Sequence, residues 1–81
     1  MKAVETTLLS FALERGSHKT FCPSEVARRL FKDDWRDQMN CVRLIADSLV
    51  QQNHLQVLQK GVIQNTLPSK LKGPIRLQIK E

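Results

Sequence analysis

Side chains suited to phosphate and base recognition gather in two stretches of this sequence, one in its middle and one near its C-terminus. Arginine and asparagine can form paired hydrogen bonds with guanine and adenine edges, whereas lysine ammonium groups suit phosphate oxygens. Such residues in both stretches point to contact with duplex DNA. The candidate nucleic-acid-binding residues are Arg36, Asn40 and Arg43 in the middle stretch and Lys60, Lys70 and Lys72 in the second.

A second polar set comes from three separate segments, so it converges only if the fold brings those segments together. The set consists of Glu25, Arg28, Arg43 and Arg76. One interpretation is an anion pocket for phosphate or carboxylate. The other is a structural salt-bridge network in which Glu25 neutralises one or two arginines, and this is the commoner use of paired guanidinium groups. We expect the structural network and keep the anion pocket as the alternative.

Catalytic and metal chemistry have little support in the sequence. It holds no Gly-rich phosphate loop and no nucleophile–base series, so we predict a non-enzymatic protein without catalytic residues. Cys22 lies next to a predicted helix start, which favours thiolate reactivity, yet no Cys-x-x-Cys partner accompanies it. The possible zinc ligands have separations that match no usual paired-ligand spacing, so we expect neither a metal nor a cofactor. These ligands are His18, Cys22, Cys41 and His54.

The positive charge is concentrated in the last third of the chain. The formal net charge is +5; up to His54 there are eight Lys or Arg against seven Asp or Glu, and after it five against one. A basic C-terminal region suits phosphate or an acidic protein surface, although mild basicity also serves solubility alone.

The length of 81 residues predicts one domain over residues 1–81 with a small core. Two cysteines form no dense disulfide framework, which is typical of a reduced cytoplasmic protein. Residues 1–15 contain Glu5 and Glu14 and no continuous apolar segment, so we expect neither a signal peptide nor a membrane span. The oligomeric state stays open.

Two helices are predicted in the first part of the chain. The first ends at Gly16, and the second begins at Pro23 and runs to Phe31; residues 20–22 between them can pair as a very short strand. The apolar face of the first helix consists of Val4, Leu8, Phe11 and Ala12, with Leu9 and Leu13 alongside.

The longest periodic segment, Asp33–Asn53, predicts a third helix after a turn at 32–34, with Asn53 as its left-handed cap. Arg36, Asn40 and Arg43 fall together with Asp47 on a polar face that is free to touch a partner. The apolar stripe comprises Trp35, Met39, Val42, Ile45, Ala46 and Leu49, and we expect Trp35 to fill a core niche between helices.

The pattern then changes to the alternation of strands. Leu55 and Val57 mark one strand, and Ile75–Ile79 alternates cleanly as a second that should pair antiparallel with it. Residues 62–63 can add a third short strand, and the loop from Gly61 to Gly73 is long enough to project. Three helices followed by a β-hairpin wing predict an α+β fold, a small winged-helix-like domain.

A series of motifs in this order resembles a bacterial family catalogued as domain of unknown function 3253, over roughly residues 5–79. The resemblance implies a winged-helix-like fold and carries no established activity. Asn53-His54 stands where the family pattern usually offers Gly. The motifs are Thr20-Phe21-Cys22-Pro23-Ser24-Glu25-Val26-Ala27-Arg28, Trp35-Arg36, Val42-Arg43, Gln59-Lys60-Gly61 and Lys72-Gly73-Pro74-Ile75-Arg76-Leu77.

These observations favour a binding module that contacts duplex DNA weakly, mainly through the basic wing and with the third helix. Three carboxylates, Asp33, Asp34 and Asp37, crowd the start of that helix and argue against classical major-groove reading. A lone domain of this kind needs to dimerise for useful specificity. The alternative is a protein–protein interaction module that meets an acidic partner with the same surfaces.

Overall fold

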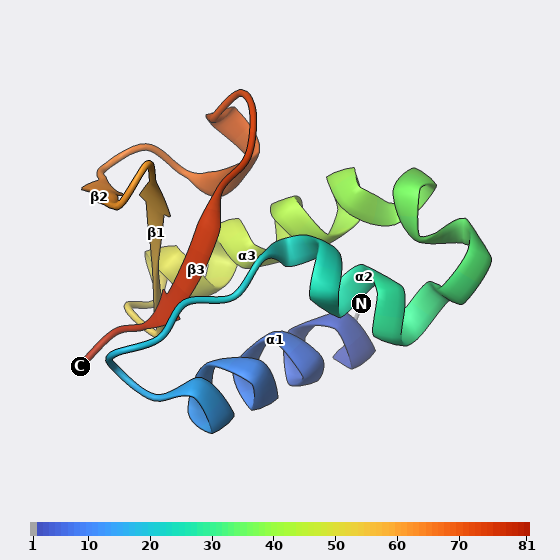
Figure 1. Ribbon diagram of the computed structural model, residues 1–81, viewed down its shortest axis with the longest axis horizontal. Coiled ribbons are helices and arrows are strands. Elements are labelled where there is room, and N and C mark those ends of the chain that lie inside the picture. The colour runs from blue at the N-terminus through green and yellow to red at the C-terminus, as the bar shows by residue number, and fades with distance from the viewer. Residues whose placement is uncertain (1) are drawn as a thin grey trace.

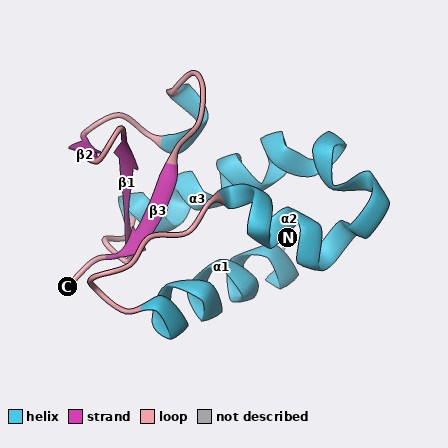
Figure 2. Cartoon of the chain, viewed as in Figure 1, coloured by secondary structure: helices cyan, strands magenta, loops and turns pink. Residues whose placement is uncertain are grey.

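The computed structural model describes residues 2–81, which fold into helices packed on a small antiparallel sheet (Figure 1). The α+β class is therefore confirmed, and Figure 2 shows the long helices ahead of the strands, with a short helical turn between the last two strands. The elements in order are α1 (Lys2–Arg15), α2 (Pro23–Phe31), the 3-10 helix η1 (Lys32–Gln38), α3 (Met39–Gln51), β1 (Leu55–Gln59), β2 (Val62–Gln64), the 3-10 helix η2 (Pro68–Lys70) and β3 (Arg76–Ile79).

The helical part differs from the prediction between residues 32 and 38. Instead of a turn followed by an α-helix from Asp33, η1 joins α2 to α3, so helical conformation continues from Pro23 to Gln51 and turns back on itself at η1 (Figure 1). Lys32 ends α2 with a φ of 48°. The acidic residues that follow it have low helix propensity, because their side chains compete for local backbone groups, and the seven residues of η1 form an unusually long 3-10 helix.

α1 buries most of the predicted apolar face, but Leu13 lies outside it. At 3.6 residues per turn, Leu13 falls on nearly the opposite side of the helix from the centre of that stripe, and 70% of it is exposed. Its inclusion in the apolar face was wrong because it follows Ala12 by a single position. The buried residues of α1 are Val4, Leu8, Phe11 and Ala12.

The sheet has the strand order β2-β1-β3, and both pairs are antiparallel. Val57 lies opposite Leu77, and Leu58 lies opposite Ile63, so the third short strand is confirmed. Phe21 adds an isolated bridge to Leu77, with backbone N–H to O distances of 2.8 and 2.7 Å. The connection between α1 and α2 is thereby fixed to the C-terminal strand.

The end of α3 follows the predicted geometry. Asn53 takes a left-handed conformation with φ 65°, and the backbone N–H of His54 donates to the carbonyl of Leu49 at 2.9 Å. Asparagine tolerates the left-handed conformation better than most residues do. Asn53 can therefore cap the helix as a glycine would. The turn delivers the chain directly into β1.

The core lies between the three α-helices and one face of the sheet, and its buried members are all apolar among residues 2–81. Phe11 and Phe21 stack with ring centroids 5.6 Å apart. Trp35 was expected to fill a core niche; it packs against this core from η1 but is only partly buried, at its edge. The inner face of α3 contributes Val42, Ala46 and Leu49, and this leaves its polar face turned outward.

The segment between β2 and β3 was expected to project, and here the structure differs. Pro68 is buried, and η2 packs against α3 so that residues 68–73 lie along that helix. A proline-initiated 3-10 turn removes one free backbone N–H and fixes one φ, which lowers the entropy cost of folding the loop back.

Candidate nucleic-acid interface

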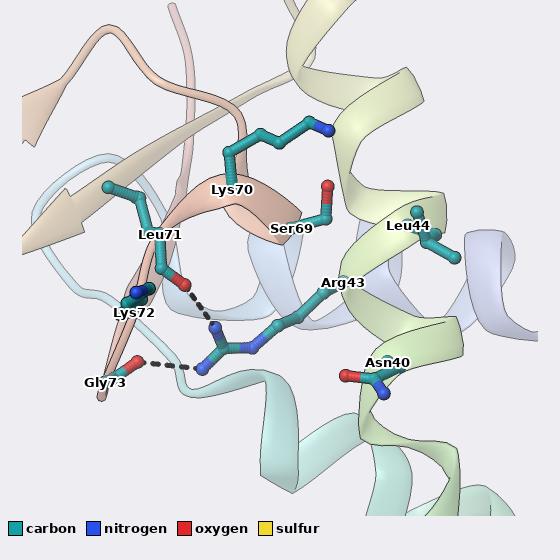
Figure 3. A pocket seen from close by; sticks show the side chains of 8 residues that line it. All are labelled: Asn40, Arg43, Leu44, Ser69, Lys70, Leu71, Lys72 and Gly73. Carbon is teal, nitrogen blue, oxygen red and sulfur yellow. Dashed lines mark hydrogen bonds between the residues drawn. The ribbon is translucent and has the colours of Figure 1, made fainter.

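An open groove of about 550 Å³ separates α3 from the segment 68–73, and we call it the basic groove (Figure 3). Four of the six predicted nucleic-acid-binding residues line it. Its lining residues are Asn40, Arg43, Leu44, Ser69, Lys70, Leu71, Lys72 and Gly73. The lining includes three cationic side chains and no carboxylate, so the groove is chemically suited to an anion.

Arg43 crosses from α3 to the loop and holds it there (Figure 3). Its Nη1 donates to the carbonyl oxygen of Leu71 at 3.0 Å, and its Nη2 donates to that of Gly73 at 2.9 Å. The guanidinium fork suits two such carbonyls because its N–H groups diverge in one plane. Two of its donors are therefore committed to the fold, and its contact with nucleic acid stays a prediction.

Asp47, one turn further along α3, holds the other end of the same segment. The backbone N–H of Ser69 donates to its Oδ1 at 2.9 Å, and the Ser69 hydroxyl donates to its Oδ2. Asp47 was placed on the polar face of the helix by its spacing, but its partner was missed. Nothing in the local sequence connects a helix residue with a serine in a later loop.

Gln59 ties the segment to the sheet as well. Its Nε2 donates to the carbonyl oxygen of Lys72 at 2.6 Å and reaches that of Pro74 at 3.5 Å. Gln59 is the last residue of β1, so Lys60, which follows it, starts the turn close to this part of the loop. Three polar side chains, from α3 and β1, thus fix the lysine-bearing segment.

The three predicted lysines remain exposed: Lys70 and Lys72 line the basic groove, and Lys60 lies in the β1–β2 turn with φ 53°. Within residues 2–81 none of them forms a salt bridge. Their charges are therefore available to a partner. Lys60 does not line the groove. The positive charge is therefore divided between Lys70 and Lys72 at the groove and Lys60 in the β1–β2 turn.

Arg36 lies apart from the groove. Its guanidinium carbon is 4.7 Å from the centroid of the Trp35 ring, and that of Arg28 is 4.4 Å from the same ring. Such cation–π contacts stabilise an exposed arginine by about 0.5–1 kcal/mol. The structure thus places Arg36 and Arg28 together on η1 and α2 around Trp35.

The predicted cluster of Glu25, Arg28, Arg43 and Arg76 forms only in part, because Glu25 and Arg76 meet in one network and the other two arginines lie elsewhere. Arg28 lies against Trp35, Arg43 lies in the basic groove, and Glu25 pairs with a residue outside the prediction, Arg15, at 2.5 Å. Arg15 was not among the predicted site residues. Its role depends on how α1 packs against α2, which no local pattern reveals.

A different network, which we call the Glu25 joint, connects α1, α2 and β3. Thr20 is its shared acceptor: its carbonyl oxygen accepts from Arg15 Nη1 at 3.1 Å and from Arg76 Nη2 at 3.2 Å, and its Oγ1 accepts from Arg76 Nε at 3.0 Å. The backbone N–H of Cys22 donates to Glu25 Oε2 at 2.8 Å, as a capping-box glutamate accepts. The joint consists of Arg15, Thr20, Cys22, Glu25 and Arg76.

The charge state of Glu25 follows from these contacts. Burial raises the pKa of its carboxyl, but the hydrogen bonds from Arg15 and from the Cys22 amide, with the charges of Arg15 and Arg76, outweigh burial and lower that pKa below its ordinary value. Glu25 is therefore ionised at neutral pH and neutralises the arginines around it. One carboxylate thus faces two guanidinium groups in the joint, of which Arg15 forms an ion pair and Arg76 donates to Thr20, and the anion pocket stays a prediction.

Comparison with known proteins gives a family and no activity. Residues 1–80 match the family described as "Protein of unknown function (DUF3253)". A comparison with curated protein sequences finds no significant match. In the part of the chain that the structure describes, no helix combines the length and apolar character needed to cross a bilayer.

Proposed function

Since the chain belongs to the family "Protein of unknown function (DUF3253)", whose description assigns no activity, we propose from its own geometry that it is a non-enzymatic, winged-helix-like module that binds duplex DNA weakly. The order of elements supports this: three helices, a short bridge at Phe21 and a hairpin whose long connection lies beside α3. In winged helices the third helix and this connection form one DNA-facing surface. The free thiols of Cys22 and Cys41 suit the cytoplasm.

The observation that carries the proposal is the pair of lysines held at the rim of the basic groove. Lys70 and Lys72 are exposed, and the side chains lining the groove beside them include Arg43 and Asn40 but no carboxylate. Their backbone is fixed by Arg43, Asp47 and Gln59. Binding phosphate therefore costs little loop entropy, because the loop is ordered before the ligand arrives.

The wing is favoured over the start of α3 as the main contact. The three carboxylates of η1, Asp33, Asp34 and Asp37, are exposed and would face phosphate oxygens of any duplex that approached this end. Lys60 extends the cationic surface in the other direction, along the β1–β2 turn. We place the phosphate contacts on Lys60, Lys70 and Lys72.

A salt titration tests the proposal. Binding of a labelled mixed-sequence duplex is measured by fluorescence anisotropy between low and physiological salt. With three phosphate contacts, the logarithm of the association constant should fall against the logarithm of the salt concentration with a slope of about −2.7. No binding at the lowest salt would contradict the proposal.

An acidic protein partner is the second candidate, and exposed apolar residues favour it. Val62 and Ile63 on β2 are 61% and 56% exposed, directly after the turn that holds Lys60. Apolar side chains beside a cation suit a protein surface better than a phosphate backbone. Absent DNA binding together with a 1:1 complex with an acidic protein would establish this alternative.

A further inference from the structure

We infer that this module recognises the phosphate backbone of duplex DNA and does not read base sequence, because the arginine of α3 holds the loop and three exposed carboxylates precede that helix. The inference rests on the proposed DNA-binding function and specifies its ligand. It concerns the outward face of α3, where a winged helix would carry its base contacts.

The first step is the state of the two arginines of this region. Arg43 uses its two Nη groups to donate to the carbonyls of Leu71 and Gly73. In the described part of the chain, Arg36 keeps its N–H groups free over the Trp35 ring, but it lies on η1, the element that also carries Asp33, Asp34 and Asp37. A bidentate contact with guanine needs two free, parallel N–H groups of one guanidinium. If Arg43 turned toward a base, the carbonyls of Leu71 and Gly73 would lose their hydrogen-bond donors. The segment 68–73, which carries Lys70 and Lys72, would then no longer be held against α3.

The second step is what remains on the exposed face. Asn40, Leu44 and Ser48 are exposed there, and the Ser48 hydroxyl already accepts from Gln52 Nε2 at 3.2 Å. Of these three, Asn40 alone can contact a base edge in bidentate fashion. Known helix readers use three or four side chains.

The third step weighs a bidentate contact from Asn40, or from Arg36 on η1 itself, against the carboxylates of η1. A bidentate contact discriminates between bases by roughly 5- to 150-fold. Each carboxylate held about 4 Å from a phosphate weakens binding by about fivefold in water, so three of them cancel the largest gain that such a contact can supply. Insertion of the start of α3 into a major groove is thus unfavourable, whereas the lysines of the wing can follow a backbone without it.

The test compares duplexes of equal length and different composition. Unlabelled A·T-rich, G·C-rich and mixed duplexes compete with a labelled mixed duplex for the full chain at low salt. We expect their inhibition constants to agree within about threefold, because phosphates are the same in all three. A preference above about tenfold would overturn the inference while the proposed function stood; absence of binding to all three would overturn both.

Two variants sharpen the result. Asn40→Ala should change affinity by the same factor for all three duplexes, whereas loss of a preference for one of them would show that Asn40 reads a base. Lys19→Gln is the control, because Lys19 is exposed in the α1–α2 connection and does not line the basic groove. It should leave the relative affinities of the duplexes unchanged.

Discussion

The Glu25 joint and the basic groove are both built around arginines, yet their charges are used in opposite ways. In the joint, Arg15 pairs with a carboxylate and Arg76 bonds to Thr20, so the positive charge is neutralised or occupied within the fold. In the groove, Arg43 bonds only to neutral carbonyls, and Lys70 stays exposed beside it. Arginine thus serves structure in both regions, whereas the unpaired lysines distinguish the binding surface.

The largest effect is expected when the lysines of the groove are reversed. Lys70→Glu with Lys72→Glu should weaken duplex binding by about a hundredfold or more, because two phosphate contacts are lost and two repulsions are added. Fluorescence anisotropy measures the affinity, and thermal melting checks the fold. Both side chains are exposed, so the melting temperature should change little. Unchanged affinity would show that Lys70 and Lys72 of the basic groove do not bind the duplex.

Removing the guanidinium of Arg43 should mainly affect stability. Arg43→Ala leaves the carbonyls of Leu71 and Gly73 without their donors, and we expect a loss of about 1–2 kcal/mol in the free energy of unfolding. Urea denaturation measures it. Arg36→Ala on the same stretch is the control, with a smaller loss of about 0.5–1 kcal/mol because only its cation–π contact disappears. Equal losses would show that Arg43 does not hold the loop.

The smallest effect is expected in the joint, and it depends on pH. Because the pKa of Glu25 is lower in the folded than in the unfolded state, its contribution is present above the unfolded pKa and is lost as pH falls through the folded pKa. Glu25→Gln should therefore cost about 0.5–1 kcal/mol at neutral pH and little in acid.

Urea denaturation at several acidic and neutral pH values checks this prediction. Glu14→Gln is the matched control, because Glu14 is an exposed glutamate of the neighbouring α1. If the variants at positions 14 and 25 lost the same stability at every pH, the joint would contribute nothing through the charge of Glu25.

Local patterns predicted much of the fold and little of the site. The stripe with Val42, Ala46 and Leu49, the alternating strands and the Asn53 cap depend on neighbours within a few residues, and the structure confirms them. The contacts of Arg43 with Leu71 and of Arg76 with Thr20 join residues 28 and 56 positions apart. Spacing can show that an arginine is on a surface, but the packing of distant segments decides its partner.

The same limit explains why the wing was expected to project. The sequence of residues 61–73 contains the turn formers of a loop, but its position depends on Asp47 and Arg43 in α3 and on Gln59 in β1. The set of four polar residues around Glu25 was right for Glu25 and Arg76 and wrong for Arg28 and Arg43, for a related reason. The prediction paired Glu25 with arginines of the quoted motifs by charge alone. The arginine that the fold places beside Glu25 is Arg15, which was not in the predicted set.

The salt dependence of duplex binding, compared between the natural chain and a variant with Lys70→Gln and Lys72→Gln, tests the central claim most directly. Each lysine that contacts a phosphate contributes about −0.9 to the slope of log association constant against log salt, so the double variant should have a slope less steep by about 1.8. An unchanged slope would contradict the claim that these two lysines of the basic groove bind the DNA backbone.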